Sequence, residues 1–141
     1  MRLFLDANVL VSVLNKEYPL FSYSSRILSL AGKQGVEVFT SPICLAIAFY
    51  FAEKKHRTKL ARQKIGVLAS HLSIAEVTRW VVNQATEDRR INDFEDGLEY
   101  YAARESRCEY IITEDTGDFY FSEISVCTCE TFLKKWLAGK S

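Results

Sequence analysis

The chain has 141 residues, of which 48% are hydrophobic and 26% charged, a composition typical of globular proteins that excludes a disordered chain. Eighteen Lys and Arg side chains balance eighteen Asp and Glu side chains, so the formal net charge is zero, which argues against a strongly cationic protein that coats nucleic acid. This length predicts a single domain, residues 1–141. The short N-terminal apolar run is interrupted by Asp6 and fits neither a signal peptide nor a membrane span. We therefore expect a cytoplasmic protein with no membrane partner.

In the first part of the chain, apolar runs alternate with segments of helical periodicity. Met1–Leu5 predicts a short strand that is buried on both faces, and Val36–Thr40 predicts a second strand. Between them, apolar residues recur at helical spacing over residues 22–31. Ser41 and Pro42 provide an N-cap and a first-turn proline for the helix that follows.

The same alternation continues towards the C-terminus. Four further segments are predicted to be helical, namely residues 58–70, Ser73–Ala85, Asn92–Ser106 and Cys129–Gly139. Tyr110–Thr113 and Ile124–Cys127 have the composition of buried strands. Strands that alternate with helices predict an α/β fold with a parallel sheet that is covered on both faces.

Acidic residues follow two of the predicted strands and begin one predicted helix. Asp6 ends the first strand, and Asp115 follows the strand of residues 110–113. Asp96 lies in the first turn of a helix for which Asp93 is a suitable N-cap. Because ligand sites in parallel sheets form at the carboxyl ends of the strands, we expect these carboxylates to converge on one divalent cation, such as Mg²⁺. Taken singly, each of these residues is more often a helix cap or a turn residue.

Three stretches of the sequence carry a resemblance to a known family. They are LDANVL at residues 5–10, DFEDGLEYYAA at residues 93–103 and CEYIITEDTGDF at residues 108–119. In their order and spacing they resemble the PIN-domain family, and in particular its VapC-like toxins, which are ribonucleases that use acidic residues with Mg²⁺ or Mn²⁺. The resemblance implies a three-layer α/β/α sandwich around a central, mainly parallel sheet.

The resemblance also implies roles for individual residues. It implies four metal ligands, of which the first three also carry catalysis and the fourth is weaker: Asp6, Asp96, Asp115 and Asp118. Asn8 matches the amide that accompanies the first acid of the family, and Thr113 matches a threonine at the end of the later strand. Both are expected to support the site.

The chain departs from the family pattern at the second acid. The glutamate that family members carry in the helix after the Ser-Pro start falls at Ile47, which cannot bind a metal ion. Glu53 is six residues further on, about 240° around the helix, and is a poor substitute. Ala7 likewise replaces a threonine. A bacterial subgroup of the family resembles this chain in lacking the glutamate, and the alternative to a nuclease is a degenerate RNA- or protein-binding module.

A basic segment provides candidates for RNA binding. No acidic residue occurs between Glu53 and Glu76, and the basic residues in this interval are Lys54, Lys55, Arg57, Lys59, Arg62 and Lys64. Such a run can follow the phosphates of an RNA strand, and the alternative is an ordinary solvated helix face. Arg89 and Arg90, just before the acidic helix, either contact a phosphate near the metal or pair with Glu87 and Asp88.

Together these features predict a metal-dependent endoribonuclease that is the toxin of a bacterial toxin–antitoxin pair. A metal-activated water requires no histidine base. The resemblance implies RNA as the substrate and two protein partners, which are a cognate antitoxin and a second copy of the chain in a homodimer. A phosphatase of the haloacid dehalogenase class is given little weight, because it would need an aspartate where the chain has Asn8.

Overall fold

The computed structural model describes residues 1–33 and 35–139, and residues 34, 140 and 141 of the expected domain lie outside the described residues. Its strands are β1 (Arg2–Leu5), β2 (Glu37–Thr40), β3 (Ser73–Ile74), β4 (Tyr110–Ile112) and β5 (Ser125–Cys127). Its helices are α1 (Ala7–Leu14), α2 (Leu20–Leu28), α3 (Pro42–Lys55), α4 (Thr58–Ser70), α5 (Arg79–Glu87), α6 (Phe94–Glu105), the 3-10 helix η1 (Thr116–Phe119) and α7 (Cys129–Ala138). The strands pair in parallel in the order β3-β2-β1-β4-β5, which confirms the predicted parallel α/β sheet.

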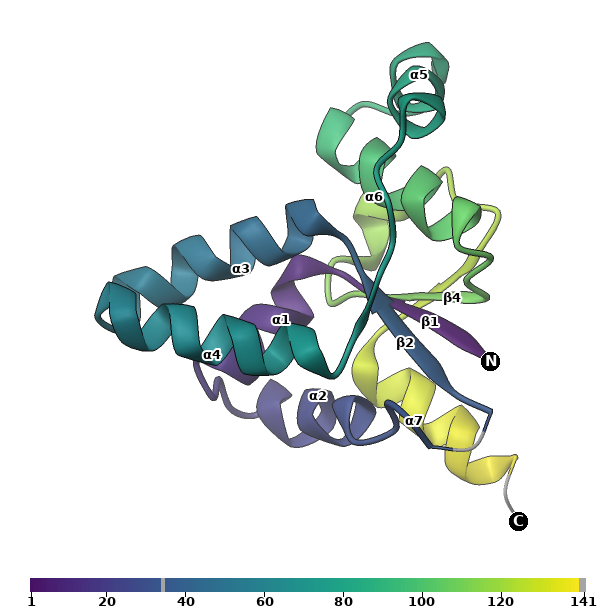
Figure 1. Cartoon of the computed structure of the whole chain (residues 1–141). Helices are drawn as coiled ribbons and strands as arrows, with labels where there is room; N and C mark the ends of the chain where they lie inside the picture. The colour runs from purple at the N-terminus through teal and green to yellow at the C-terminus, as the bar shows by residue number, and fades with distance from the viewer. Residues whose placement is uncertain (34, 140–141) are drawn as a thin grey trace.

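Helices cover both faces of this sheet and give the three-layer α/β/α arrangement. In Figure 1, α2 and α7 lie below the strands, whereas α5 and α6 lie above them. Helices α3 and α4 form a hairpin that extends to the left in this view, and α3 packs against α1. Within the described residues, no helix combines the length and the apolar character that crossing a membrane requires.

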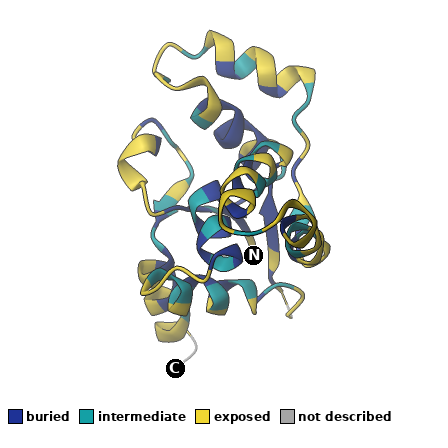
Figure 2. Ribbon diagram, turned by 90° about the vertical axis from the view of Figure 1, so that its left-hand side faces the viewer, coloured by how far each residue is buried: buried dark blue, intermediate teal, exposed yellow. Residues whose placement is uncertain are grey.

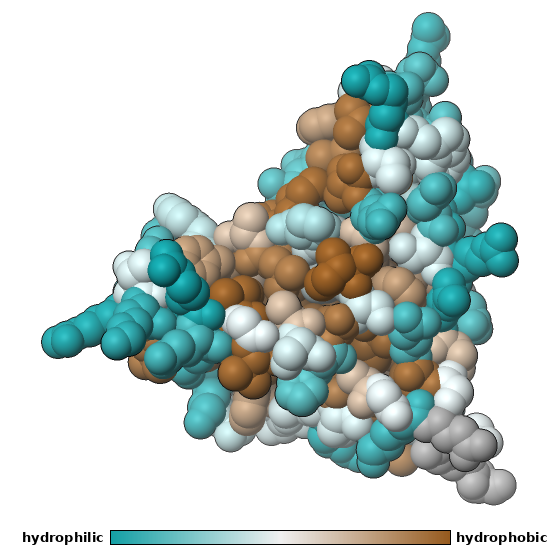
Figure 3. All heavy atoms as spheres, in the orientation of Figure 1, coloured by the Kyte–Doolittle hydropathy of each residue, from teal (hydrophilic) through white to brown (hydrophobic). Residues whose placement is uncertain are grey.

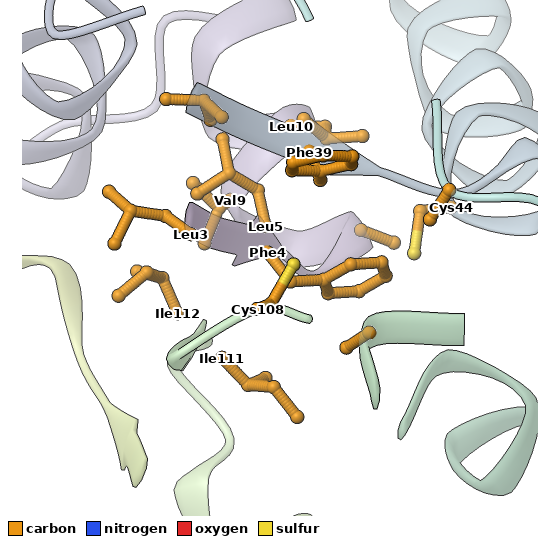
Figure 4. Packing of buried hydrophobic residues seen from close by; sticks show 14 of the residues in the cluster. Leu3, Phe4, Leu5, Val9, Leu10, Phe39, Cys44, Cys108, Ile111 and Ile112 are labelled. Atoms are coloured by element: carbon orange, nitrogen blue, oxygen red, sulfur yellow. The ribbon is translucent and has the colours of Figure 1, made fainter. Parts of the chain in front are cut away.

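The central strand β1 forms the middle of the core. Leu3, Phe4 and Leu5 are fully buried, and Phe4 is in register with Phe39 of β2 and with Ile111 of β4 (Figure 4). Burial of each such side chain stabilises the fold by about 1.5–3 kcal/mol. Figure 2 shows buried residues gathered at the centre of the molecule and exposed residues on the outer helix surfaces. Because β1 is held from both sides, the residue that follows it is fixed at the carboxyl edge of the sheet.

The prediction of a helix over Ser73–Ala85 is wrong in its first part. Ser73 and Ile74 instead form β3, a two-residue strand at the edge of the sheet, beside β2. The helix α5 begins only at Arg79, with Thr78 as its N-cap. The pairing with β2 determines this strand, because two residues are too few to carry a strand periodicity of their own.

Helix α6 is fixed at its start and along one side. Asp93 is its N-cap and accepts a hydrogen bond from the backbone N–H of Asp96 at 3.0 Å, which confirms the predicted cap. At Gly97 a Cβ atom would lie only 3.1 Å from the side chain of Ile91 and 3.2 Å from that of Ala85 in α5. The close approach of α5 to α6 therefore depends on the missing side chain of this glycine.

Candidate metal centre

A cleft opens where the strand order reverses. Strands β2 and β3 lie on one side of β1, whereas β4 and β5 lie on the other side, so the carboxyl ends of β1 and β4 border a crevice, as in other open α/β sheets. The cleft has a volume of about 420 Å³. The acidic residues that line it are Asp6, Glu17, Glu95, Asp96, Glu99, Asp115 and Asp118, and no described residue of its lining is Lys, Arg or His. All four predicted metal ligands therefore lie in one cleft.

Asp6 both begins a helix and faces the cleft. It is the N-cap of α1, and its Oδ1 accepts a hydrogen bond from the backbone N–H of Ala7 at 2.6 Å. Its Oδ2 accepts a hydrogen bond from the hydroxyl of Thr113 at 2.7 Å. Only 8% of Asp6 is exposed. The two roles considered for this aspartate, a helix cap and a functional carboxylate, are therefore compatible in one side chain.

Asn8 connects the ends of β1 and β4. Its Nδ2 donates hydrogen bonds to Oγ1 of Thr113 and to Oδ2 of Asp115, both at 3.1 Å. Its Oδ1 accepts a hydrogen bond from the backbone N–H of Glu114 at 3.3 Å, and its Nδ2 lies 3.4 Å from Oδ2 of Asp6. These bonds hold Asp6 and Asp115 in a fixed relation to each other.

Glu114 and Asp115, which follow Thr113 at the end of β4, have different surroundings. Glu114 accepts a hydrogen bond from the backbone N–H of Cys129 at 3.1 Å and so satisfies a donor at the start of α7. Asp115 lines the cleft, as does Asp118 in the first turn of η1. Asp115 and Asp118 are exposed and form the solvent side of the cleft.

Asp96 lies on the α6 side of the cleft in an unfavourable electrostatic environment. Burial raises its pKa to about 7, and the negative charges of Asp93, Asp118 and Asp6 act in the same direction. Burial also raises the pKa of Glu95, with smaller contributions from Asp93 and Asp6. A cation in the cleft would relieve this repulsion.

Glu99 is a residue of the cleft that the sequence interpretation missed. It is 2% exposed, and its Oε1 accepts a hydrogen bond from the thiol of Cys44 at 2.9 Å. Ligand atoms of Asp6, Cys44 and Glu99 all lie within 4.8 Å of one another. Burial raises the pKa of Glu99 well above its usual value, and the nearby Asp6 raises it further. The one signal in the sequence is a charged residue inside the otherwise uncharged run Gly97–Ala103, three positions after Asp96.

The α3 wall of the cleft is apolar. Ile47 and Phe51, one turn apart on α3, both line the cleft. Glu53 does not line it and accepts a hydrogen bond from the hydroxyl of Thr58 at 2.9 Å, in agreement with the expectation that it is a poor substitute. Helix α3 thus contributes no carboxylate to the described lining.

The basic side chains of the α3–α4 hairpin have different surroundings. Lys55 and Lys64 donate hydrogen bonds, at 2.6 Å and 3.2 Å, to backbone carbonyls at the C-terminal end of α1, where the helix dipole favours a cation. The ammonium of Lys54 lies 4.3 Å from the ring centroid of Tyr50. The remaining candidates for RNA binding are exposed, namely Arg57, Lys59 and Arg62. The tip of this hairpin is hydrophilic, at the left of Figure 3.

Arg90 pairs with Asp88, which confirms one of the two alternatives for this arginine. Its guanidinium lies 2.8 Å from Oδ2 of Asp88, and the hydroxyl of Tyr101 donates a hydrogen bond to the same oxygen at 2.7 Å. Arg90 also lies 3.8 Å from a carboxylate oxygen of Glu123. The hydrogen bonds from Arg90 and Tyr101 hold the pKa of Asp88 well below its usual value.

The donor set of the cleft fits a divalent metal ion. Its charged side chains are carboxylates, which are the hard oxygen ligands that Mg²⁺ and Mn²⁺ bind. Cys44 is a softer group, but burial raises the pKa of its thiol, which donates a hydrogen bond to Glu99. With no basic side chain in the described lining, the acids carry negative charge that an external cation would neutralise.

Known proteins share both the sequence pattern and the fold. Over 139 residues the chain is 27% identical to Ribonuclease VapC1 from Aquifex aeolicus, which covers 96% of this chain and 95% of the relative. The fold is similar to that of a toxin–antitoxin complex from Klebsiella pneumoniae, with a TM-score of 0.68 and 20% identity over 89% of this chain and 96% of that chain. It is also similar to VapC20 from Mycobacterium tuberculosis, described as a sarcin–ricin loop cleaving toxin, with a TM-score of 0.64 and 18% identity over 87% of this chain and 98% of that chain. Since the model of the PIN domain matches residues 2–117, the chain belongs to the PIN domain family.

Proposed function

We propose that the chain is a metal-dependent endoribonuclease and the toxin of a bacterial toxin–antitoxin pair. The observation that carries this proposal is the acidic cleft that is lined by residues following β1 and β4 and by residues of α6. In this cleft Asp6, Asp96 and Asp115 hold Mg²⁺ or Mn²⁺ and carry catalysis, and Asp118 is a fourth ligand. The similarity to Ribonuclease VapC1 supports RNA as the substrate.

The chain's own residues prepare the site for this chemistry. A divalent ion bound there supplies a water of lowered pKa and stabilises the charge that develops on a phosphodiester during hydrolysis. Thr113 holds Oδ2 of Asp6, and Asn8 holds Oδ2 of Asp115, each through a hydrogen bond. The carboxyl of Asp96, whose pKa is raised to about 7, loses its proton near neutral pH and becomes available as a ligand.

The RNA strand enters along α3 in this proposal. Phe51 lines the cleft and is 44% exposed, and the ammonium of Lys54 lies 5.6 Å from its ring centroid. Exposed aromatic rings beside cations suit the bases and phosphates of single-stranded RNA. The other proposed RNA contacts follow in sequence, namely Lys55, Arg57, Lys59, Arg62 and Lys64.

The proposal includes protein partners and a location. A protein of similar fold has been solved as a toxin–antitoxin complex, which supports a cognate antitoxin. We further propose that the chain acts as a homodimer in the cytoplasm and that residues 1–141 form one functional domain.

The test is cleavage of RNA by the purified chain in Mn²⁺ and in EDTA. We expect the wild type to cleave only in Mn²⁺ and Asp6→Asn to be inactive in both. Asn is as good an N-cap as Asp, so α1 keeps its start in this variant. Equal RNA cleavage by the wild type and Asp6→Asn would refute the proposed nuclease activity.

The apolar side chain of Ile47 favours a second candidate function, an RNA- or protein-binding module without hydrolysis. The same experiment separates the two candidates. Retention of RNA by the wild type without cleavage in either Mg²⁺ or Mn²⁺ would establish the binding module.

A further inference from the structure

We propose that Glu99 on α6 supplies the carboxylate that α3 lacks at Ile47 and that it is a ligand of the same divalent ion. The inference rests on the proposed function and adds a residue to which the family pattern gives no role. The substitution at Ile47 is then the relocation of an acid to another helix, and the site is complete.

Helix α6 presents three carboxylates to the cleft, those of Glu95, Asp96 and Glu99. Asp96 and Glu99 are three positions apart, and residues at this spacing lie on the same side of a helix. A different side of α6 packs closely on α5 at Gly97. Glu99 therefore extends towards the end of β1, where its carboxylate lies within 4.8 Å of that of Asp6.

Helix α3 holds Glu99 in this place. The thiol of Cys44 donates a hydrogen bond to Oε1 of Glu99 at 2.9 Å. Cys44 precedes Ile47 by three residues, so both lie on the same side of α3, and Ile47 and Glu99 line the same cleft. In the family, the helix that corresponds to α3 carries the second acid. In this chain α3 instead has the apolar Ile47 and the thiol of Cys44, which donates a hydrogen bond to Glu99 of α6.

The surroundings of Glu99 suit a ligand of a cation. A buried carboxylate is stabilised by a basic side chain, by several donors, by a proton or by a cation. The charged neighbours of Glu99 are acids, Asp6 and Asp96, and no described residue of the cleft lining is basic. A cation shared by Asp6 and Glu99 converts this repulsion into binding energy.

The experiment compares the Mn²⁺ affinity of four proteins by isothermal titration calorimetry. Glu99→Gln keeps the size of the side chain and an acceptor for Cys44 but removes the charge. Glu105→Gln, at the exposed end of the same helix, is the matched control. The double variant Glu99→Gln/Ile47→Glu returns an acid to α3, and the wild type is the reference.

We expect Glu99→Gln to bind Mn²⁺ at least about 10-fold more weakly than the wild type, the loss seen even for partners of metal ligands. Glu105→Gln should match the wild type, and the double variant should regain most of the lost affinity. RNA cleavage in Mn²⁺ should rank the four proteins in the same order.

Wild-type Mn²⁺ affinity in Glu99→Gln would overturn the inference, and so would a double variant that regains no affinity. The two possible failures are distinguishable. If only the inference fails, the wild type still binds Mn²⁺ and cleaves RNA. If the proposed function fails, the wild type does neither, which would overturn both. Thermal unfolding without metal shows first whether each variant is folded. If Glu99→Gln does not fold, Glu99→Asp takes its place. Its side chain is shorter by one methylene, so its carboxylate lies further from the ion, and we expect the same order of Mn²⁺ affinities.

Discussion

Asp88 and Asp96 are eight residues apart in the chain, and their carboxyl groups lie in opposite electrostatic surroundings. Asp88 accepts hydrogen bonds from Arg90 and Tyr101, which keep its pKa well below the usual value. Burial raises the pKa of Asp96 to about 7, and its charged neighbours, which are acids, act in the same direction. The charge of one carboxylate is thus compensated within the chain, whereas the other carboxyl is left to a proton or to a cation from outside.

The difference separates two groups of acidic residues in this protein, those that stabilise the fold and those that line the cleft. The pair at Asp88 stabilises the folded chain without any ligand. Three acids of the cleft, Glu95, Asp96 and Glu99, instead destabilise the metal-free chain when charged, because burial and neighbouring acids raise their pKa values. Clefts with such raised pKa values are characteristic of functional sites. Each of the following changes affects one of the two regions and should leave the other unaffected.

The largest effect is expected from Asp96→Asn. This variant should lose Mn²⁺-dependent RNA cleavage by about 100-fold or more, because it removes a ligand of the ion that stabilises the transition state. Its thermal unfolding temperature without metal, measured by circular dichroism, should be equal to or above that of the wild type. A variant that keeps its activity would show that Asp96 resembles Asp88 and is a structural residue.

Addition of Mn²⁺ should have the next largest effect. An ion at 100 times its dissociation constant stabilises the folded state by about 2.7 kcal/mol, which a thermal shift assay detects easily. Asp88→Asn should show the full shift on addition of Mn²⁺, and Asp6→Asn should show little of it. Equal shifts in the two variants would place the ion outside the cleft.

The pH dependence of the metal-free chain provides a third comparison. The raised pKa of Asp96 means that the folded state holds this proton more tightly than the unfolded state, so the free energy of unfolding falls as the pH rises from about 4 to about 7. The unfolding temperature of the wild type should therefore fall relative to that of Asp96→Asn across this window. Parallel curves for the two proteins would contradict the proposed repulsion.

The smallest effect is expected from Asp88→Asn. Its unfolding temperature should be lower than that of the wild type by roughly 3 °C at neutral pH, because Arg90 is half exposed and solvent screens the pair. The lowered pKa means that the stabilisation is present above the usual pKa of 3.8 and is lost as the pH falls below it. The two melting curves should therefore converge in acid, and a difference that persists there would point to packing instead of charge.

The sequence predicts the parallel sheet because continuous apolar runs such as LFL in β1 are typical of strands covered on both faces. The sequence also predicts that Asp6 and Asp115 lie near each other, since the carboxyl ends of parallel strands lie at the same edge of the sheet. β3 was missed because its two residues become a strand only by pairing with β2. Glu99 was missed because a charged residue inside a helix resembles any solvent-facing position until the packing shows that it is 2% exposed.

The pairing partner of Arg90 could not be decided in advance for a related reason. A guanidinium near several acids can reach more than one of them, and the side-chain directions in the folded chain select among these. In this fold the turn after α5 brings Asp88 and Arg90 together, and Tyr101 of α6 donates the additional hydrogen bond.

The hydrogen bond between Thr113 and Asp6 joins residues 107 positions apart in the sequence, and β1 likewise pairs with β4. A ribosome therefore releases the first acidic residue long before those that must join it. A nascent chain that stops before β4 contains Asp6 without Asp115, and its central strand lacks one neighbour. Interrupted translation thus yields fragments that lack part of the acidic cleft.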